Sequence, residues 1–158
     1  MSFDSRDFRD ALGRFATGIC VITFAPKDGK PFGMTVNSFA SVSLDPPLVL
    51  WSLQKNSDVY DEIVSAERYG INILSSEQQA LSDQYAKKSD HDLSPEHYSL
   101  GKTGSPVLKN SIVSFECASE AQYDGGDHLI IVGRVLEMEN SPTGDPLLFV
   151  SGKYRELH

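Results

Sequence analysis

The hydrophobic positions of this 158-residue chain fall mostly into short runs of the kind that form β-strands. Residues 19–25, ICVITFA, are almost continuously apolar, which is typical of a strand buried on both faces. Residues 112–123 alternate instead, which places Phe115 and Cys117 on one expected face. Further strands are predicted at residues 32–36, 39–44, 48–54, 69–75, 129–139 and 146–154.

Apolar residues recur every three or four positions in three other segments, which predicts amphipathic helices. The first covers residues 5–18, and Gly18 is expected to end it. The second covers residues 57–66, with Ser57 as the expected N-cap. The third covers residues 75–88 and begins with the Ser-to-Gln spacing of a capping box.

Turn residues separate the predicted strands. Residues 26–30 contain an Asp-Gly pair, which is a hairpin signal, and the DPP sequence at residues 45–47 stops any strand or helix. The strands follow one another directly and do not alternate regularly with helices. We therefore predict a mainly β fold, a mostly antiparallel barrel with a few peripheral α-helices, formed as a single domain by residues 1–158.

The charge of the chain limits its partners. It carries 14 lysines and arginines against 22 aspartates and glutamates, a formal net charge of −8, so neither nucleic acid nor a membrane is an expected partner. No apolar run approaches the ~20 residues that cross a bilayer, and the charged N-terminus does not resemble a signal peptide. The cytoplasm is the expected compartment, with Cys20 and Cys117 as buried free thiols.

Several common catalytic motifs are missing from the sequence. The four histidines, His91, His97, His128 and His158, are irregularly spaced, so no metal site is predicted. There is no GxSxG nucleophile motif and no Walker phosphate loop. The glycines form no GxGxxG after a strand, so a dinucleotide would have to bind by a route other than a Rossmann unit.

Neutral hydrogen-bonding side chains gather in residues 35–38 and 52–57, where predicted strands end. The second segment also holds one cation, Lys55, and the helix expected after Ser57 would offer free N–H groups to a phosphate. Two interpretations stay open: ordinary strand-end polar residues with a helix cap, or a flavin site with the ring on one segment and the phosphate on the other. The side chains concerned are Thr35, Asn37, Ser38, Ser52, Gln54, Asn56 and Ser57.

A second candidate site is His128, which the predicted turn GGDH delivers to the first position of a strand. It is either a surface histidine beside an acidic turn or a polar contact for a charged or redox-active ligand.

Taken in order, the motifs of the chain resemble the short-chain flavin reductase family. These proteins are FMN-binding split barrels that serve as reductase components of two-component flavin monooxygenases. The resemblance covers nearly the whole chain, and TVNSFASVSLDPPL is its most specific part. The motifs are FRDALGRFATGICVIT, GMTVNSFASVSLDPPLVLWSL, YGINILS, GGDHLIIVGRV and PLLFVSGKY.

The resemblance implies a homodimeric split barrel with a flavin near the subunit interface. Phe8, Phe15 and Trp51 are candidate contributors to that interface, and an ordinary core position is the favoured alternative for each of them. It assigns the isoalloxazine ring and ribityl chain to residues in two segments: Thr35, Val36, Asn37, Ser38, Ser52, Leu53 and Gln54. It assigns the flavin phosphate to Lys55, Ser57, Ala86 and Lys88. It assigns the nicotinamide nucleotide to His128 and Tyr154.

The implied activity is that of an NAD(P)H:flavin oxidoreductase, in which a hydride passes from nicotinamide C4 to N5 of FMN or FAD. Reduced flavin would then be supplied to a monooxygenase. Two other functions stay open: ferric reduction on the same fold, and a non-enzymatic flavin-binding or storage role. The sequence shows no clear clamp for a 2′-phosphate, which favours NADH over NADPH, although Arg134 or Lys153 could supply one.

Overall fold

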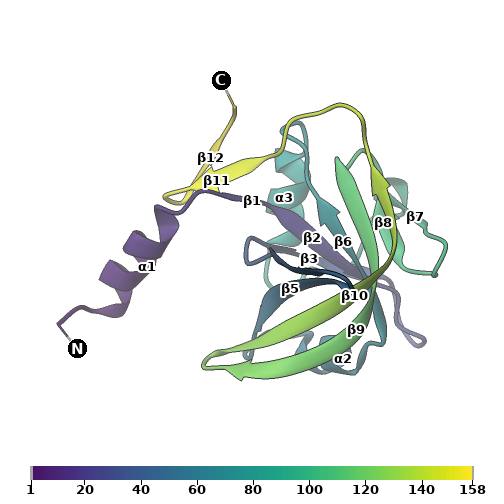
Figure 1. The fold of residues 1–158 in the computed structure, drawn as a ribbon, viewed down its shortest axis with the longest axis horizontal. Helices are drawn as coiled ribbons and strands as arrows, with labels where there is room; N and C mark the ends of the chain where they lie inside the picture. The colour runs from purple at the N-terminus through teal and green to yellow at the C-terminus, as the bar shows by residue number, and fades with distance from the viewer. Residues whose placement is uncertain (1, 158) are drawn as a thin grey trace.

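Antiparallel strands form most of the regular secondary structure, which a computed structural model describes for residues 2–157 (Figure 1). Seven of them make one sheet in the order β3-β2-β6-β9-β10-β5-β4. Every neighbouring pair in this sheet is antiparallel, which confirms the predicted strand arrangement. The strands are β2 (Cys20–Phe24), β3 (Phe32–Val36), β4 (Ala40–Leu44), β5 (Pro47–Gln54), β6 (Arg68–Ile73), β9 (Val113–Gly125) and β10 (His128–Asn140).

Smaller elements surround this sheet. A three-stranded sheet has the order β1-β11-β12, and a separate hairpin pairs β7 with β8. Their bounds are β1 (Thr17–Gly18), β7 (Tyr98–Leu100), β8 (Pro106–Leu108), β11 (Leu148–Val150) and β12 (Lys153–Arg155). The helices are α1 (Ser5–Gly13), α2 (Tyr60–Ser65), α3 (Gln79–Tyr85) and a 3₁₀ turn at Pro95–His97. Within the described residues, no helix is long and apolar enough to cross a membrane.

The large sheet curls so that its two ends approach each other. Residues 37–39 carry the chain from β3 at one edge to β4 at the other. Ser38 joins the two ends, because its Oγ accepts a hydrogen bond from Ser52 N at 2.9 Å and donates to Ser52 O at 3.3 Å. No strand ladder links β3 to β4 in the described part, so the barrel is open there, as expected of a split barrel.

The core lies on both faces of β2, as its continuous apolar sequence predicted. Ile22 and Phe24 belong to a cluster inside the barrel, whereas Val21 belongs to a second cluster on the opposite face of the strand. Trp51 is fully buried in the first cluster, where it lies edge-on to Tyr69. Trp51 is therefore a core residue, the alternative given for it above, and not a contributor to a subunit interface. Cys20 and Cys117 are free and buried, as predicted, and burial raises the pKa of both thiols to about 12.

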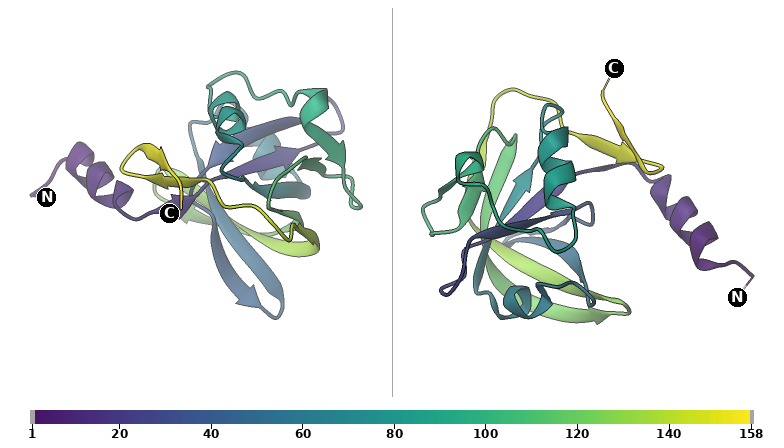
Figure 2. Two further views of the ribbon diagram at one scale, coloured as in Figure 1. Left: turned by 90° about the horizontal axis from the view of Figure 1, so that it is seen from above. Right: turned by 180° about the vertical axis from the view of Figure 1, so that it is seen from behind.

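The first helix is shorter than predicted. It ends at Gly13, not at Gly18, because Thr17 and Gly18 pair with β11. Asp4 caps its start by accepting a hydrogen bond from Asp7 N at 2.8 Å. The helix projects away from the rest of the chain, and none of its residues is buried (Figures 1 and 2).

The starts of the other two helices also differ from prediction. The N-cap position of α2 is occupied by Val59, and Ser57 instead accepts a weak hydrogen bond from Val59 N at 3.3 Å. Before α3, Gln78 Oε1 accepts from Ser75 N at 2.8 Å, so the capping-box contact forms in the turn that precedes the helix. Local spacing located these turns but not the first helical residue.

Asn72, fully buried on β6, uses all four hydrogen-bonding positions of its amide. Its Nδ2 donates to Val21 O at 3.0 Å and Thr23 Oγ1 at 3.1 Å. Its Oδ1 accepts from Leu108 N at 2.9 Å and Ser114 Oγ at 3.0 Å. This one side chain therefore ties together β2, β6, β8 and β9.

We expect Asn72→Ala to lower the free energy of unfolding by about 3 kcal/mol, because it leaves several buried polar groups without partners. For a chain of this size, that loss corresponds to a fall in Tm on the order of 10 °C by calorimetry. The matched control is Asn140→Ala at the exposed end of β10, which should change stability by less than about 0.5 kcal/mol. Equal stability of the two variants would contradict the role given to Asn72.

Candidate functional site

A cavity of about 460 Å³ lies where the ends of β3 and β5 face each other across the open barrel. The segment after α3 and the first residue of β10 complete its lining. The lining residues are Met34, Thr35, Val36, Asn37, Ser38, Ser52, Leu53, Gln54, Asn56, Ser57, Asp58, Tyr85, Ala86, Lys88, Ser89, His91 and His128. This volume falls within the range of about 300–1,000 Å³ that is usual for small-molecule sites.

The β3 wall is held in place by its own hydroxyl groups. Thr35 Oγ1 donates to Ser82 O on α3 at 2.8 Å, and Ser38 bonds to the backbone of Ser52. Asn37 lies between these anchors, is exposed, and makes no side-chain hydrogen bond to other described residues. The hydroxyls therefore fix the wall, while the amide is available to a ligand.

The β5 wall is positioned by its pairing with β10. In the ladder, Ser52 pairs with Ile130, Leu53 pairs with Leu129, and Gln54 pairs with His128. This register sets His128 beside Gln54 at the edge of the cavity.

The imidazole of His128 is oriented by its chain neighbour. His128 Nδ1 donates to Asp127 Oδ1 at 2.7 Å, which leaves Nε2 as the ring's other polar atom. This hydrogen bond, together with the nearby histidine charge, lowers the pKa of Asp127 below its ordinary value. The pair thus presents a fixed imidazole at one side of the cavity.

Charged side chains also line the cavity. Lys88 is one of them and has no ion-pair partner among residues 2–157. Asp58 and His91 are two others, and His91 Nε2 lies 2.9 Å from Asp58 Oδ1. The segment that contains His91 is bound to the edge of β3, because Gly33 N donates to His91 O at 2.8 Å.

The structure brings together all of the predicted site residues except two. Lys55 lies outside the lining and pairs with Asp124, and this hydrogen bond and charge lower the pKa of Asp124. Tyr154 also lies outside it. Its hydroxyl is 2.7 Å from Ser82 Oγ and donates to Asp83 Oδ1 at 2.9 Å.

Several lining residues were not predicted from the sequence. Met34 immediately precedes the predicted segment, and Asp58 immediately follows the second one. Tyr85, Ser89 and His91 flank the predicted pair of Ala86 and Lys88, in and next to a polar loop of the kind that often covers a site. Extending each predicted segment by a few residues would have found most of them.

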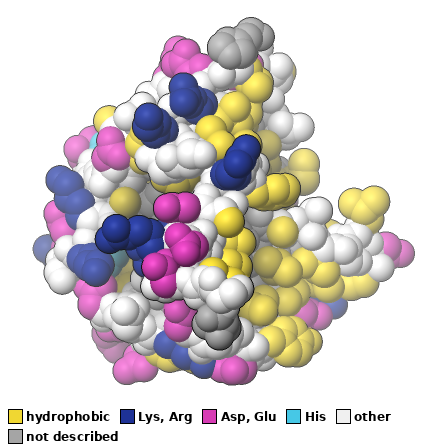
Figure 3. All heavy atoms as spheres, turned by 90° about the vertical axis from the view of Figure 1, so that its left-hand side faces the viewer, with side chains coloured by type: hydrophobic (Ala, Val, Ile, Leu, Met, Phe, Trp, Pro, Cys, Tyr) yellow, Lys and Arg dark blue, Asp and Glu magenta, His cyan; other side chains and the backbone are white. Residues whose placement is uncertain are grey.

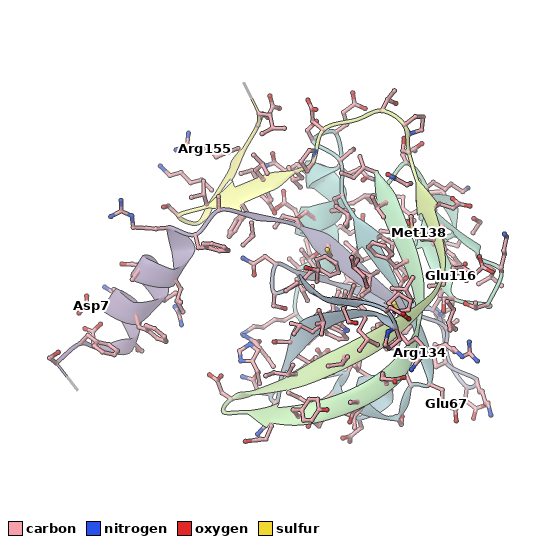
Figure 4. All side chains as sticks on the ribbon, in the orientation of Figure 1. Asp7, Glu67, Glu116, Arg134, Met138 and Arg155 are labelled. Atoms are coloured by element: carbon pink, nitrogen blue, oxygen red, sulfur yellow. The ribbon has the colours of Figure 1, made fainter. Side chains whose placement is uncertain are left out.

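Arg134 and Lys153 do not line the cavity. Arg134, labelled on β10 in Figure 4, pairs with Glu120 at 2.8 Å. Among the described residues, no group of histidine, cysteine and carboxylate side chains is arranged to hold a metal ion. The cavity therefore offers neutral amides, a lysine without an ion-pair partner among the described residues, and two imidazoles that are each hydrogen-bonded to an aspartate, a set suited to a polar ring with an anionic tail.

Comparisons with known proteins identify similar chains. The family described as "Flavin reductase like domain" matches residues 12–158. The FMN reductase (NADH) SmoA of Agrobacterium fabrum is 44% identical over 153 residues, which cover 96% of this chain and 85% of SmoA. The reductase subunit HsaB of a flavin-dependent monooxygenase from Rhodococcus jostii is 35% identical over 153 residues, which cover 97% of this chain and 78% of HsaB.

A probable flavin reductase of Rhizobium meliloti is 45% identical over 88% of this chain, but the match spans only 45% of that relative's length. Among solved structures, the NADH:FAD oxidoreductase SgcE6 of Streptomyces globisporus, in complex with NAD and FAD fragments, has a TM-score of 0.92. It is 32% identical, and the match covers 98% of this chain and 93% of SgcE6.

Proposed function

This chain belongs to the family of the flavin reductase like domain, and we propose that it is an NADH-dependent flavin reductase. The observation that carries the proposal is the cavity between β3 and β5, which is lined by neutral polar side chains, by a lysine without an ion-pair partner among residues 2–157 and by a histidine oriented by its neighbour. The relatives named as an FMN reductase (NADH) and as an NADH:FAD oxidoreductase support it.

The residues of the cavity fit a flavin. Isoalloxazine is a planar ring with amide-like edges, and the exposed amides of Asn37, Gln54 and Asn56 can donate to and accept from such edges without placing a full charge there. Lys88, Ser57 and Ala86 also line the cavity, and we assign the flavin phosphate to them, with the Lys88 ammonium as the attracting charge. FMN and FAD share the ring, the ribityl chain and the first phosphate, so these contacts serve either.

A bound flavin supplies the hydride-accepting ring, with NADH as the donor. The contribution of the chain is to orient the two ligands and to exclude water between them. His128, fixed by Asp127, is the residue we assign to the nicotinamide nucleotide. Arg134 is the residue best suited to hold the 2′-phosphate of NADPH, but it lies outside the cavity and is paired with Glu120. This pairing supports NADH over NADPH as the donor.

The exposed apolar surface supports a homodimer. Phe8 and Leu12 of the projecting helix are exposed, and so is Phe15, which follows the helix and is 80% exposed. A nine-residue helix is marginal in water without a packing partner. Seen from the side on which α1 projects, the surface divides into a charged part and a broad hydrophobic part (Figure 3). A second copy of the chain would cover these side chains by symmetry.

We also propose that the reduced flavin is used by a separate monooxygenase, since relatives such as HsaB are named as reductase subunits of such systems. The two free, buried cysteines support action in a reducing compartment, the cytoplasm. Ferric reduction and flavin storage are the functions that the assays below would reveal if the proposal fails.

The proposal predicts that purified protein oxidises NADH only when FMN or FAD is added, as measured by the fall in NADH absorbance. Oxidation should saturate with both ligands, and NADPH should be the poorer donor. Flavin binding without any NADH oxidation would indicate a storage protein. Oxidation that requires ferric ion in addition to flavin would indicate the ferric reductase.

Ser38→Ala should weaken flavin binding by roughly two- to tenfold without unfolding the chain, because the loss of the Ser38–Ser52 hydrogen bonds loosens the join between the two walls. Fluorescence quenching of FMN gives the affinity. Ser41→Ala, at an exposed position on β4, is the matched control and should bind FMN normally. Normal affinity in both variants would remove Ser38 from the site.

His128→Ala should raise the KM for NADH while the affinity for FMN stays nearly constant. The loss of one hydrogen bond predicts about a fivefold rise, and more if the lost contact is to a charged group. Asp127→Asn, which keeps the imidazole but weakens its orientation, should give a smaller rise. Weakened FMN binding with an unchanged KM for NADH would mean that the two ligands had been assigned to the wrong sides of the cavity.

Sedimentation at micromolar concentration should give twice the chain mass of 17.4 kDa. Replacing both Phe8 and Phe15 by Glu should shift the protein towards the monomer, because two charges would enter the apolar contact. Asp10→Ser, on the same helix, is the control and should leave the dimer intact. A wild-type monomer would contradict the proposed assembly.

A further inference from the structure

We infer that the hydrogen-bonded pair of Asp58 and His91 determines a specificity of the cavity: the preference for a flavin that carries a phosphate over riboflavin, which carries none. The inference rests on the proposed function and names a feature of the same cavity. The hydrogen bond between Asp58 and His91 joins the turn after β5 to the segment after α3.

The pair is part of the cavity lining. Asp58 and His91 both line the cavity, together with Lys88 and Ser57. The Asp58 side chain is 47% exposed, so its carboxylate is accessible to solvent and to a ligand. His91 Nε2 donates to one of its oxygens at 2.9 Å.

A carboxylate in this position opposes phosphate binding unless its charge is engaged. Two anions a few ångströms apart repel each other, and the repulsion is strongest where water is partly excluded. The hydrogen bond from His91 occupies an Asp58 lone pair and holds the carboxylate against the loop. Lys88, which has no ion-pair partner in the described range of residues, is then left to attract the phosphate.

The burial of His91 is an independent sign that its ring serves more than packing. Its side chain is only 10% exposed, and Nδ1 is buried without a hydrogen-bond partner in the described part of the chain. A buried polar atom without a partner destabilises a fold, so an apolar side chain would suit packing better. The backbone anchor of the loop, Gly33 N to His91 O at 2.8 Å, does not need the imidazole. Variants of the ring should therefore keep the loop in place.

The test is the ratio of two dissociation constants, for FMN and for riboflavin, each measured by fluorescence quenching. His91→Ala should weaken FMN binding about tenfold, the effect of one charge-assisted hydrogen bond or one exposed repulsive charge. Riboflavin binding should change by less than about twofold, because riboflavin has no phosphate to be repelled. His91→Gln, which keeps an N–H donor, should retain much of the FMN preference.

The double variant Asp58→Asn/His91→Ala decides between electrostatics and loop structure. Removal of the carboxylate should restore FMN affinity to within about threefold of wild type, because the repulsive charge is gone. Asp92→Asn, in the same loop but outside the cavity lining, is the control and should leave the ratio unchanged.

An equal loss of FMN and riboflavin binding in His91→Ala, or no recovery in the double variant, would overturn the inference and make His91 a loop anchor only. Loss of FMN preference in Asp58→Asn alone would also overturn it, since that variant removes the supposed repulsion. A wild-type chain that binds neither flavin would overturn the proposed function itself, a result distinct from an unchanged ratio.

Discussion

The arrangement of the whole barrel depends on one buried amide, that of Asn72. An amide carries two donors and two acceptor positions, and here all four are satisfied inside the protein, by groups on β2, β8 and β9. A partly satisfied network in the same place would destabilise the fold, whereas a complete one fixes a single arrangement of strands. Thr23 extends the network by donating to Pro106 O at 2.6 Å, which secures the β7–β8 hairpin against the sheet.

The geometry of the cavity follows from this central constraint. β3 reaches the centre of the sheet through β2, and β5 reaches it through β10 and β9, so the two walls lie on opposite sides of Asn72. They meet only because the sheet curls, and the Ser38–Ser52 hydrogen bonds hold them together where no ladder does. A site built between two ends of one sheet is positioned by rigid strands and not by a loose loop, which suits the alignment of two rings.

The sequence predicted the strands and most of the site because both have local signatures. Alternation and apolar runs indicated the strands. Polar side chains at strand ends made a site one of two interpretations, and the resemblance to the flavin reductase family then named the individual residues. The misplaced features were decided by distant partners. Helix α1 ends early because Thr17 pairs with Phe149, and Lys55 is drawn from the cavity by Asp124, sixty-nine positions along the chain. No local pattern encodes such contacts.

The same limit applies to the hydroxyl groups of the site. The family resemblance assigned Thr35 and Ser38 to a ligand, and both do line the cavity, but their hydroxyls bond to Ser82 and Ser52. Which partner a hydroxyl takes depends on the backbone groups that tertiary structure brings within about 3 Å. Position along a strand predicts proximity to a site, whereas the hydrogen-bond partner is known only once the fold is known.

An acidic chain with a net charge of −8 must still receive anionic ligands if it is a flavin reductase that uses NADH. The pairing of carboxylates near the cavity, more than the number of lysines, explains how an acidic chain could accept an anionic ligand. Three aspartates in or next to the cavity each face a donor: Asp124 faces Lys55, Asp127 faces His128, and Asp58 faces His91. Each pairing reduces the local negative potential, and Lys88 is left without such a partner among the described residues. On the proposed function, the local arrangement of charge, rather than the total charge, is what would allow a phosphate to enter the cavity.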